Sequence, residues 1–566
     1  MKTFNSRYLT YSEIAQEFVL TKNFQELLKP CHSILLGTRG CGKTTMLKML
    51  HPAAVREYQN VHSEFHLEFY GVYIPADRQW SLILEQLDKE TEHIEFYEKV
   101  SKSLVNVNIL LAFIDTLKVL FDDESFGAEK KTEYLSLLVN YWKLGKSIPP
   151  IIDIIRLNLK GMIIDIKNAI SDSDFSFVFP YVCKSNFEDT IALAVELFNS
   201  LFEDSSKKWA LCFDEMEIAP EWLQRKIVNG CLRSIDQTLL FKITATPDWK
   251  VCNNNHKSPT QGNDFEFIKC WNYDYSSTME WRIFCDSIIE SQVLSKYGVT
   301  QDEFISLLSD PKKHELNFFF HELPKVDKGF SEVFQKENYD ENNGVIQIKN
   351  WIQRKKKYKY PVLLCRYSWF TQDRQYGIPF ENVYLGDWLL YKMSDGNPRI
   401  FCNILGDIVL SLRSTKGNLM PKLPALRDIV TDYSKHFYEG SSFLLDEYKT
   451  EYGDFTFEEL INIIGWYFNH ELLSDRYNPS PITMFTLGKS SSLQSFVKKA
   501  LQQGVVVKVE DQQVETSGSS DGIYRLSYML YPYFHIIQSF AKNIISLEEI
   551  LTDNLKNEDS SDFTNR

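Results

Sequence analysis

Short apolar runs alternate with helix-forming segments along the first half of the chain. The runs are five to seven residues long and lie at residues 32–36, 68–74, 209–213, 239–245 and 265–271. Runs of this length predict strands that are buried on both faces, and the segments between them carry apolar residues at the helical period. The pattern therefore predicts an α/β fold with a parallel sheet covered by helices on both faces.

The longest connection in this pattern is itself helical. Residues 84–202 carry mainly helical periodicity and are too many for a simple link between two strands. We expect a helical insertion at about 85–185 and a returning helix at 186–202. Upstream, Ser12 is the expected N-cap of one amphipathic helix that runs to residue 29. Beyond residue 279 the pattern is mainly helical, although residues 310–388 are irregular, polar and aromatic.

Composition narrows the class of protein. Of the 566 residues, 44% are hydrophobic and 24% are charged, which excludes a fibrous chain and a largely disordered one. The net charge of −14 excludes nucleic-acid binding by bulk charge alone. Ten cysteines without a C-x-x-C pair are typical of reduced thiols, and no uninterrupted apolar run is long enough to span a membrane. We expect a cytoplasmic protein without membrane contact.

A phosphate-binding motif follows the first predicted strand. The segment matches G-x-x-x-x-G-K-[ST] and reads Gly37-Thr38-Arg39-Gly40-Cys41-Gly42-Lys43-Thr44-Thr45. Its glycines let backbone N–H groups turn toward phosphate oxygens, and the following helix adds a favourable dipole. We expect Lys43 to reach the β and γ phosphates of ATP and Thr44 to hold Mg²⁺.

Two adjacent carboxylates close the strand at 209–213. Asp214 comes at the carboxyl edge of the predicted sheet, where it is expected to hold Mg²⁺ together with Thr44. Glu215 follows it and is expected to orient the attacking water. Glu217 is interpreted as an ordinary acid at a helix start.

The next strand, at 239–245, ends in polar residues. A side chain there lies between the phosphate-binding loop and the two carboxylates, and it can touch the γ-phosphate or the attacking water. Thr246 is the first candidate and Thr244 the alternative.

This order of elements resembles the AAA+ ATPases, and more narrowly their origin-recognition initiator-like branch. The resemblance continues at Asp395-Gly396-Asn397-Pro398-Arg399, which is similar to the family's G-x-x-R sensor 2 motif. It implies that Arg399 contacts the γ-phosphate from a second domain. Proline near a helix start and a planar guanidinium suit that role.

The resemblance implies four parts. These are a P-loop AAA+ core at 1–290 with the helical insertion, a helical lid at 291–450 with the irregular insertion at 310–388, a winged-helix domain at 451–545, and a tail at 546–566. Residues 493–503 are the expected recognition-type helix. Residues 504–510 and 522–528 are the expected strands of the wing.

The partners stay open between duplex DNA and protein. The wing region, residues 481–540, holds five basic and four acidic residues, fewer positive charges than a DNA-reading wing normally shows. The dense basic run at 354–359 has interleaved tyrosines that suit contact with phosphate and base. The family implies self-association, but residues 247–265 lack the usual arginine finger, and Arg225, Arg233 and Arg282 are equal alternatives.

Two functions follow from these features. The first is an ATP-hydrolysing switch that engages duplex DNA or assembles with a partner. The alternative is a nucleotide-switch ATPase subunit of a bacterial anti-phage defence system, in which the wing and the helical insertion bind an effector or trigger protein.

Overall fold

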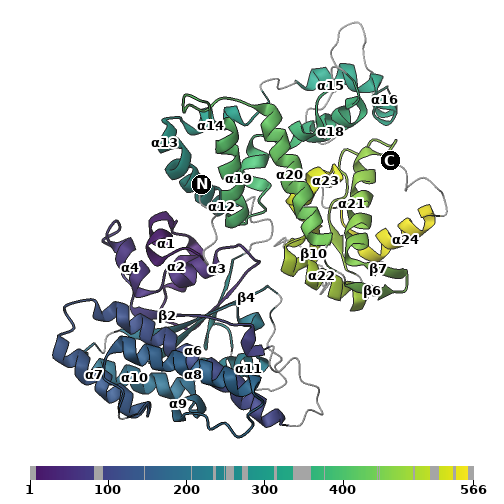
Figure 1. Ribbon diagram of the computed structural model, residues 1–566. Helices are drawn as coiled ribbons and strands as arrows, with labels where there is room; N and C mark the ends of the chain where they lie inside the picture. Colours follow the sequence, from purple (N-terminus) through teal and green to yellow (C-terminus); the bar gives the residue numbers. More distant parts are fainter. Residues whose placement is uncertain are drawn as a thin grey trace. The chain divides into compact units, whose positions relative to one another are not determined.

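The computed structural model describes residues 8–81, 93–145, 147–204, 207–233, 238–247, 249, 260–270, 278–310, 315–335, 359–374, 377–442, 444, 446–487, 491–509, 522–538 and 543–558. The chain divides into two compact units (Figure 1). The first consists of Asn5–Gly37 and Gly42–Cys270, and the second consists mainly of Trp271–Arg566, with Thr38–Cys41 grouped with it.

A five-stranded sheet forms the centre of the first unit. Its order is β2-β3-β4-β1-β5, and every neighbouring pair is parallel. The strands are β1 (Ser33–Leu36), β2 (Phe69–Pro75), β3 (Lys208–Asp214), β4 (Leu239–Ala245) and β5 (Glu266–Lys269). All five predicted strands are confirmed within one or two residues, because the central strands are mainly apolar and buried on both faces.

Two short helices replace the single helix expected at the start of the chain. They are α1 (Tyr11–Glu17) and α2 (Lys22–Leu27). Thr10, and not Ser12, caps α1 in a capping box with Glu13, and Thr21 caps α2. The expected continuous helix was wrong because Thr21 offers the backbone a second helix start in the middle of the apolar pattern.

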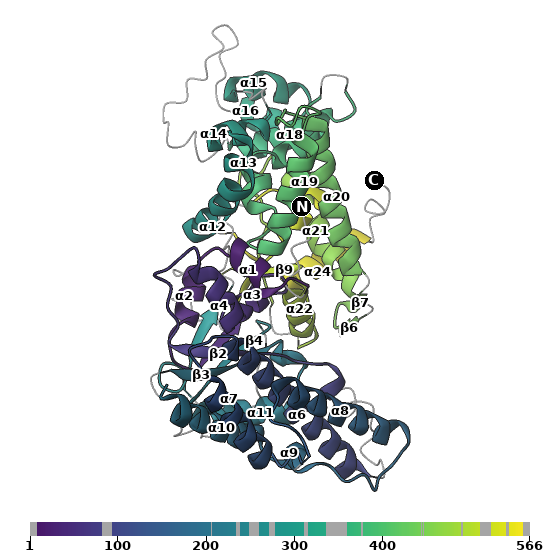
Figure 2. The same ribbon diagram turned by 60° about the vertical axis from the view of Figure 1, so that its left-hand side comes forward.

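Helices supply the rest of the first unit, and both views show those of the expected insertion gathered together (Figures 1 and 2). The helices are α3 (Lys43–Lys48), α4 (Pro52–Gln59), α6 (Ile94–Phe121), α7 (Ala128–Tyr141), α8 (Ile152–Ser171), α9 (Tyr181–Lys184), α10 (Phe187–Phe202), the 3₁₀ turn η1 (Met216–Ile218) and α11 (Glu221–Asn229). The helical character expected between residues 84 and 202 is confirmed over the described part.

Helix α6 is the core of this helical group. Sixteen of its 28 residues are buried, among them the polar Ser101 and Asn106. Ser101 donates to the Trp80 carbonyl at 2.9 Å, and Asn106 donates to the Cys183 carbonyl at 2.9 Å. By length and composition α6 is apolar enough to cross a membrane, although polar residues interrupt its apolar run. Of its most apolar window 61% is buried, as in the core helix of a protein that does not span a membrane.

The second unit is mainly helical and contains a small four-stranded sheet of order β11-β8-β10-β9. Its first half holds α12 (Met279–Ile289), α14 (Gln301–Leu307), α15 (Leu316–Glu322), α16 (Lys328–Gln335), α18 (Tyr360–Thr371), the π-helical turn η7 (Trp388–Lys392), α19 (Pro398–Leu412) and α20 (Leu423–Ser442). Its second half holds β6 (Glu447–Thr450), β7 (Gly453–Thr456), α21 (Phe457–Leu473), β8 (Phe485–Thr486), α22 (Ser491–Gln503), β9 (Val506–Val509), β10 (Ile523–Leu526), α23 (Tyr531–Phe534), β11 (Ile545–Ser546) and α24 (Leu547–Glu558).

The segment 310–388, expected to be irregular, is helical over much of its described part, where α15, α16 and α18 lie. A buried ion pair explains the misleading polarity. Arg366 and Asp327 have side chains that are 0% and 1% exposed, and Arg366 also donates to the carbonyls of Leu472 and Ser474. Charged residues that look like loop surface in the sequence are therefore core residues here.

Candidate functional site

The predicted phosphate loop lies between β1 and α3. Gly42 is the N-cap of α3 with φ +92°, a left-handed conformation that favours glycine. Lys43 is 7% exposed, and its ammonium donates to the Gly37 carbonyl at the start of the loop. The loop thus brings a buried lysine and the open N-terminus of a helix to the carboxyl end of the sheet.

The other residues of the loop differ in exposure. Arg39 is exposed, the Cys41 thiol is buried, and Thr44 and Thr45 are half-buried at the first turn of α3. Gly40 has φ +89°, so a second left-handed position precedes the helix.

Asp214 ends β3, and its carboxylate is bound from both sides. The residue is 3% exposed. Tyr73 of β2 donates its hydroxyl to Oδ2 at 2.9 Å, and Thr244 of β4 donates its hydroxyl to Oδ1 at 2.6 Å. Since a buried carboxylate needs donors, the two neighbouring strands satisfy both oxygens and fix the direction of this group.

Glu215 stands directly after β3 in a left-handed backbone conformation, with φ +56° and ψ +48°. Its N–H donates to the Thr244 hydroxyl at 2.9 Å. Thr244 therefore joins the backbone of Glu215 to the carboxylate of Asp214. Thr246 is 6% exposed, and its carbonyl accepts from the N–H of Trp249 at 3.1 Å. Of the two threonine candidates, the alternative is the one in contact with Asp214.

The chain is similar to a known family of proteins. The model of the ORC-CDC6-like family matches residues 1–544. The chain belongs to the ORC-CDC6-like family. None of the curated proteins compared with the chain matches it. The α/β fold and the class of nucleotide-hydrolysing AAA+ ATPase follow from membership.

The donor set of this ORC-CDC6-like protein fits the nucleotide and metal of its family. Asp214 and Thr44 offer a carboxylate and a hydroxyl, which are hard oxygen ligands of the kind that Mg²⁺ takes. The carboxylate oxygen Oε2 of Glu217, in η1, is buried without a hydrogen-bond partner, which leaves acceptor capacity beside the same group of residues. Bound there, the ion would neutralise phosphate charge.

Glu217 lies in the first turn of η1, as the helix-start interpretation expected, but one of its carboxylate oxygens is buried. Burial raises the pKa of its carboxyl, and the nearby carboxylates of Glu215 and Asp214 raise it further, while Lys43 lowers it. These influences place Glu217 in the same electrostatic cluster as the three predicted residues. In the sequence, the only indication that Glu217 belongs to this cluster is its position two residues after Glu215.

Tyr73 was missed by sequence reasoning. Burial raises the pKa of its hydroxyl, and the hydrogen bond to Asp214 acts in the same direction, so the group stays protonated and remains a donor. In the sequence it is one of several aromatic residues in a strand. Only the pairing of β2 with β3 brings it to Asp214.

Arg399 lies in the second unit, in the first turn of α19. Asn397 caps this helix by accepting from the N–H groups of Arg399 and Ile400, and Pro398 stands at the first helical position. The helix start expected from the motif is thus present. Contact of Arg399 with phosphate stays a prediction.

Thr244→Val should disturb the site without enlarging or filling space, because valine is close to threonine in shape. It leaves Asp214 and the Glu215 N–H each short of one partner, so we expect a loss of about 1.5–3 kcal/mol in the free energy of unfolding, measured in urea. ATP turnover should fall as well. Thr244→Ser is the matched control and should retain both properties; a valine variant with normal turnover would exclude Thr244 from positioning.

Glu217→Gln should stabilise the protein at neutral pH. A carboxyl whose pKa is raised by folding opposes folding once it ionises, so the penalty is absent below its ordinary value of 4.5 and grows as pH rises through the raised pKa. The melting temperature of the variant should exceed that of the wild type by a few degrees near neutral pH and converge with it in acid. Glu221→Gln, at an exposed carboxylate, is the control. A gain that is independent of pH would contradict the assigned burial.

Proposed function

We propose that the protein is an ATP-binding and ATP-hydrolysing switch of the AAA+ initiator type. The observation that carries this proposal is the cluster at the carboxyl end of the sheet. There β1 with its glycine loop is separated from β3, with Asp214, by β4 alone. Parallel strands bring their carboxyl ends to one edge, which is where ligands bind in open α/β sheets.

The proposed roles follow from chemistry and position. Lys43 and the loop N–H groups hold the phosphates, and Thr44 with Asp214 holds Mg²⁺. Glu215 orients the attacking water, with Thr246 available to the γ-phosphate. Arg399 closes the lid on the nucleotide. ATP then favours one arrangement of core, lid and C-terminal elements, and hydrolysis releases it.

Features of the second unit support duplex DNA as the partner. The sequence of helix α22 followed by the antiparallel hairpin β9–β10 has the order expected of a winged helix. A groove of about 440 Å³ between α22 and β6 is lined by Lys449, Lys498 and Lys499, together with Asp446 and Glu447. The lysines suit phosphate contacts, and the carboxylates limit their number. Most of the basic run 354–359 lies outside the described residues, so its part in DNA contact stays a prediction.

A second candidate is the nucleotide-switch ATPase of a defence system, with a protein as partner or trigger. One face of α8 favours it. Ile154, Leu157 and Ile164 are 36%, 64% and 58% exposed there. Several exposed apolar side chains on the same face of a helix are typical of a surface that contacts another protein. Self-association would serve either function.

Hydrolysis of ATP with and without duplex DNA separates the two candidates. For the DNA switch, turnover should rise with duplex, and the affinity for duplex should fall more than about tenfold between about 50 and about 200 mM salt. Lys43→Ala should lose ATP retention and serves as the blank. Slow turnover that is indifferent to DNA would favour the protein-triggered switch, and normal ATP affinity in Lys43→Ala would exclude the phosphate loop.

Glu215→Gln should retain ATP but lose turnover. The amide keeps the shape of the side chain and cannot take a proton, so we expect a decrease of about a hundredfold or more in the hydrolysis rate. Retained nucleotide is counted after rapid gel filtration. Glu221→Gln is the matched exposed control, and wild-type turnover in Glu215→Gln would remove Glu215 from the mechanism.

A further inference from the structure

A tight turn in the second unit sets the direction in which α19 begins. Asp395 has φ +54° and Gly396 has φ +71°, so two successive residues are left-handed. The N–H of Asp395 donates to the Lys392 carbonyl at 2.8 Å, and the N–H of Asn397 donates to the Ser394 carbonyl at 3.0 Å. Arg399 follows two residues after this turn. Any movement of the turn therefore moves the base of Arg399.

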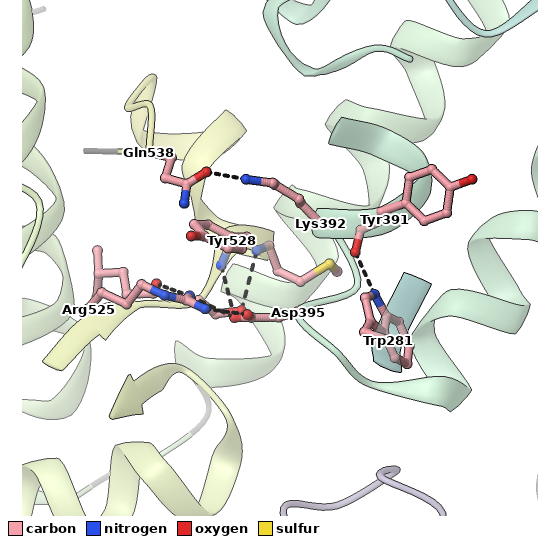
Figure 3. A network of polar contacts seen from close by, with 10 residues as sticks. Trp281, Tyr391, Lys392, Asp395, Arg525, Tyr528 and Gln538 are labelled. Atoms are coloured by element: carbon pink, nitrogen blue, oxygen red, sulfur yellow. Dashed lines mark hydrogen bonds and ion pairs between the residues drawn. The ribbon is translucent and has the colours of Figure 1, made fainter. Parts of the chain in front are cut away.

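The Asp395 carboxylate binds strand β10. Arg525 donates from Nη2 to Oδ1 at 2.7 Å and from Nη1 to Oδ2 at 3.1 Å (Figure 3). The N–H of Tyr528 donates to Oδ2 at 3.1 Å. The side chains of Arg525 and Asp395 are 4% and 9% exposed. A bidentate pair with so little water around it is directional and is screened little by salt.

Further contacts hold Arg525 in this position. Its guanidinium lies over the Tyr528 ring at 3.8 Å, and Nη1 also donates to the Leu526 carbonyl at 3.0 Å. In the ladder, Arg525 pairs with Val507 of β9. The guanidinium is therefore fixed relative to the whole β9–β10 hairpin.

Two other contacts join the segment before the turn to the segment after β10. Lys392 donates to the Gln538 side chain, as Figure 3 shows. Tyr384 donates its buried hydroxyl to the Ile536 carbonyl at 2.7 Å. On the other side, Trp281 of α12 donates to the Tyr391 carbonyl at 2.6 Å. The segment that leads into the turn is thus held to α12 on one side and to the residues after β10 on the other.

We propose that the Asp395–Arg525 pair couples the nucleotide site to the β9–β10 hairpin. When Arg399 contacts ATP, the turn that carries it takes one position, and the hairpin follows because Arg525 cannot remain behind without leaving a buried charge unpaired. Asp395 is a positioning residue for Arg399, and Arg525 is the residue that transmits the state. This inference rests on the proposed role of Arg399.

Amide hydrogen exchange of the full chain, with and without Mg·ATP, tests the coupling. In the wild type, ATP should slow exchange in the phosphate loop and α3, and it should also slow exchange at residues 523–528 by about tenfold, a usual size for coupling between sites. The Tyr528 amide is the direct reporter, because its N–H binds Asp395. Protection of the loop without any change at 523–528 would overturn the coupling.

Variants of the pair make the test specific. Arg525→Gln and the milder Asp395→Asn should keep the ATP-dependent protection of the phosphate loop but reduce the change at 523–528 to less than about twofold. Lys435→Gln, in α20, is the matched control. It removes an exposed ion pair with Glu439 in the same unit and should leave the coupling intact. Circular dichroism confirms that each variant is folded.

The two proposals fail in different ways. If ATP protects neither the loop nor the hairpin of the wild type, the nucleotide switch is wrong and the coupling is wrong with it. If the loop is protected and the change at 523–528 persists in folded Arg525→Gln and Asp395→Asn, the nucleotide switch stands and the pair is not the link.

Discussion

A carboxylate that is nearly removed from water must be met by donors, and this requirement connects the fold to the chemistry of the first unit. Asp214 can end β3 in a buried place because β2 supplies Tyr73 and β4 supplies Thr244. Both strands are immediate neighbours of β3 in the sheet order. A different order would leave the same carboxylate unpaired. The topology is therefore part of the site, beyond its role as a scaffold.

The same requirement shapes the second unit. Asp327 with Arg366, and Asp395 with Arg525, are two carboxylate–guanidinium pairs that are almost completely buried. Each joins segments that are far apart in the sequence, by 39 and 130 residues. Pairs of this kind are weak evidence for added stability, but they are costly to break on one side. They therefore favour a few defined arrangements of the helices over many arrangements that differ by small shifts.

Much of the first unit is predictable from local pattern. The strands are continuous apolar runs, the glycine loop has a fixed spacing, and Asp214 follows its strand directly. The partners of Asp214 are not predictable in this way, because Tyr73 and Thr244 come from positions 141 and 30 residues away. Side-chain partners elsewhere in both units were not predictable from local pattern either. Arg366 and Asp327 look like surface charges until α18 and α16 are folded together, and Thr10 and Thr21 decide helix starts through side-chain hydrogen bonds that hydrophobic periodicity does not record.

The left-handed backbone of Glu215 places stability and chemistry in opposition at one position. A non-glycine residue in this conformation costs about 1 kcal/mol or more, and glycine would occupy it without that cost. Selection for a more stable fold would thus favour Glu215→Gly. This substitution keeps the sheet, the loop and the hydrogen bond from the N–H of residue 215 to Thr244. In the proposed mechanism that change removes only the group that orients water. A single base substitution would then convert a protein that returns to its starting state after hydrolysis into one that binds ATP and stays in the ATP-bound state.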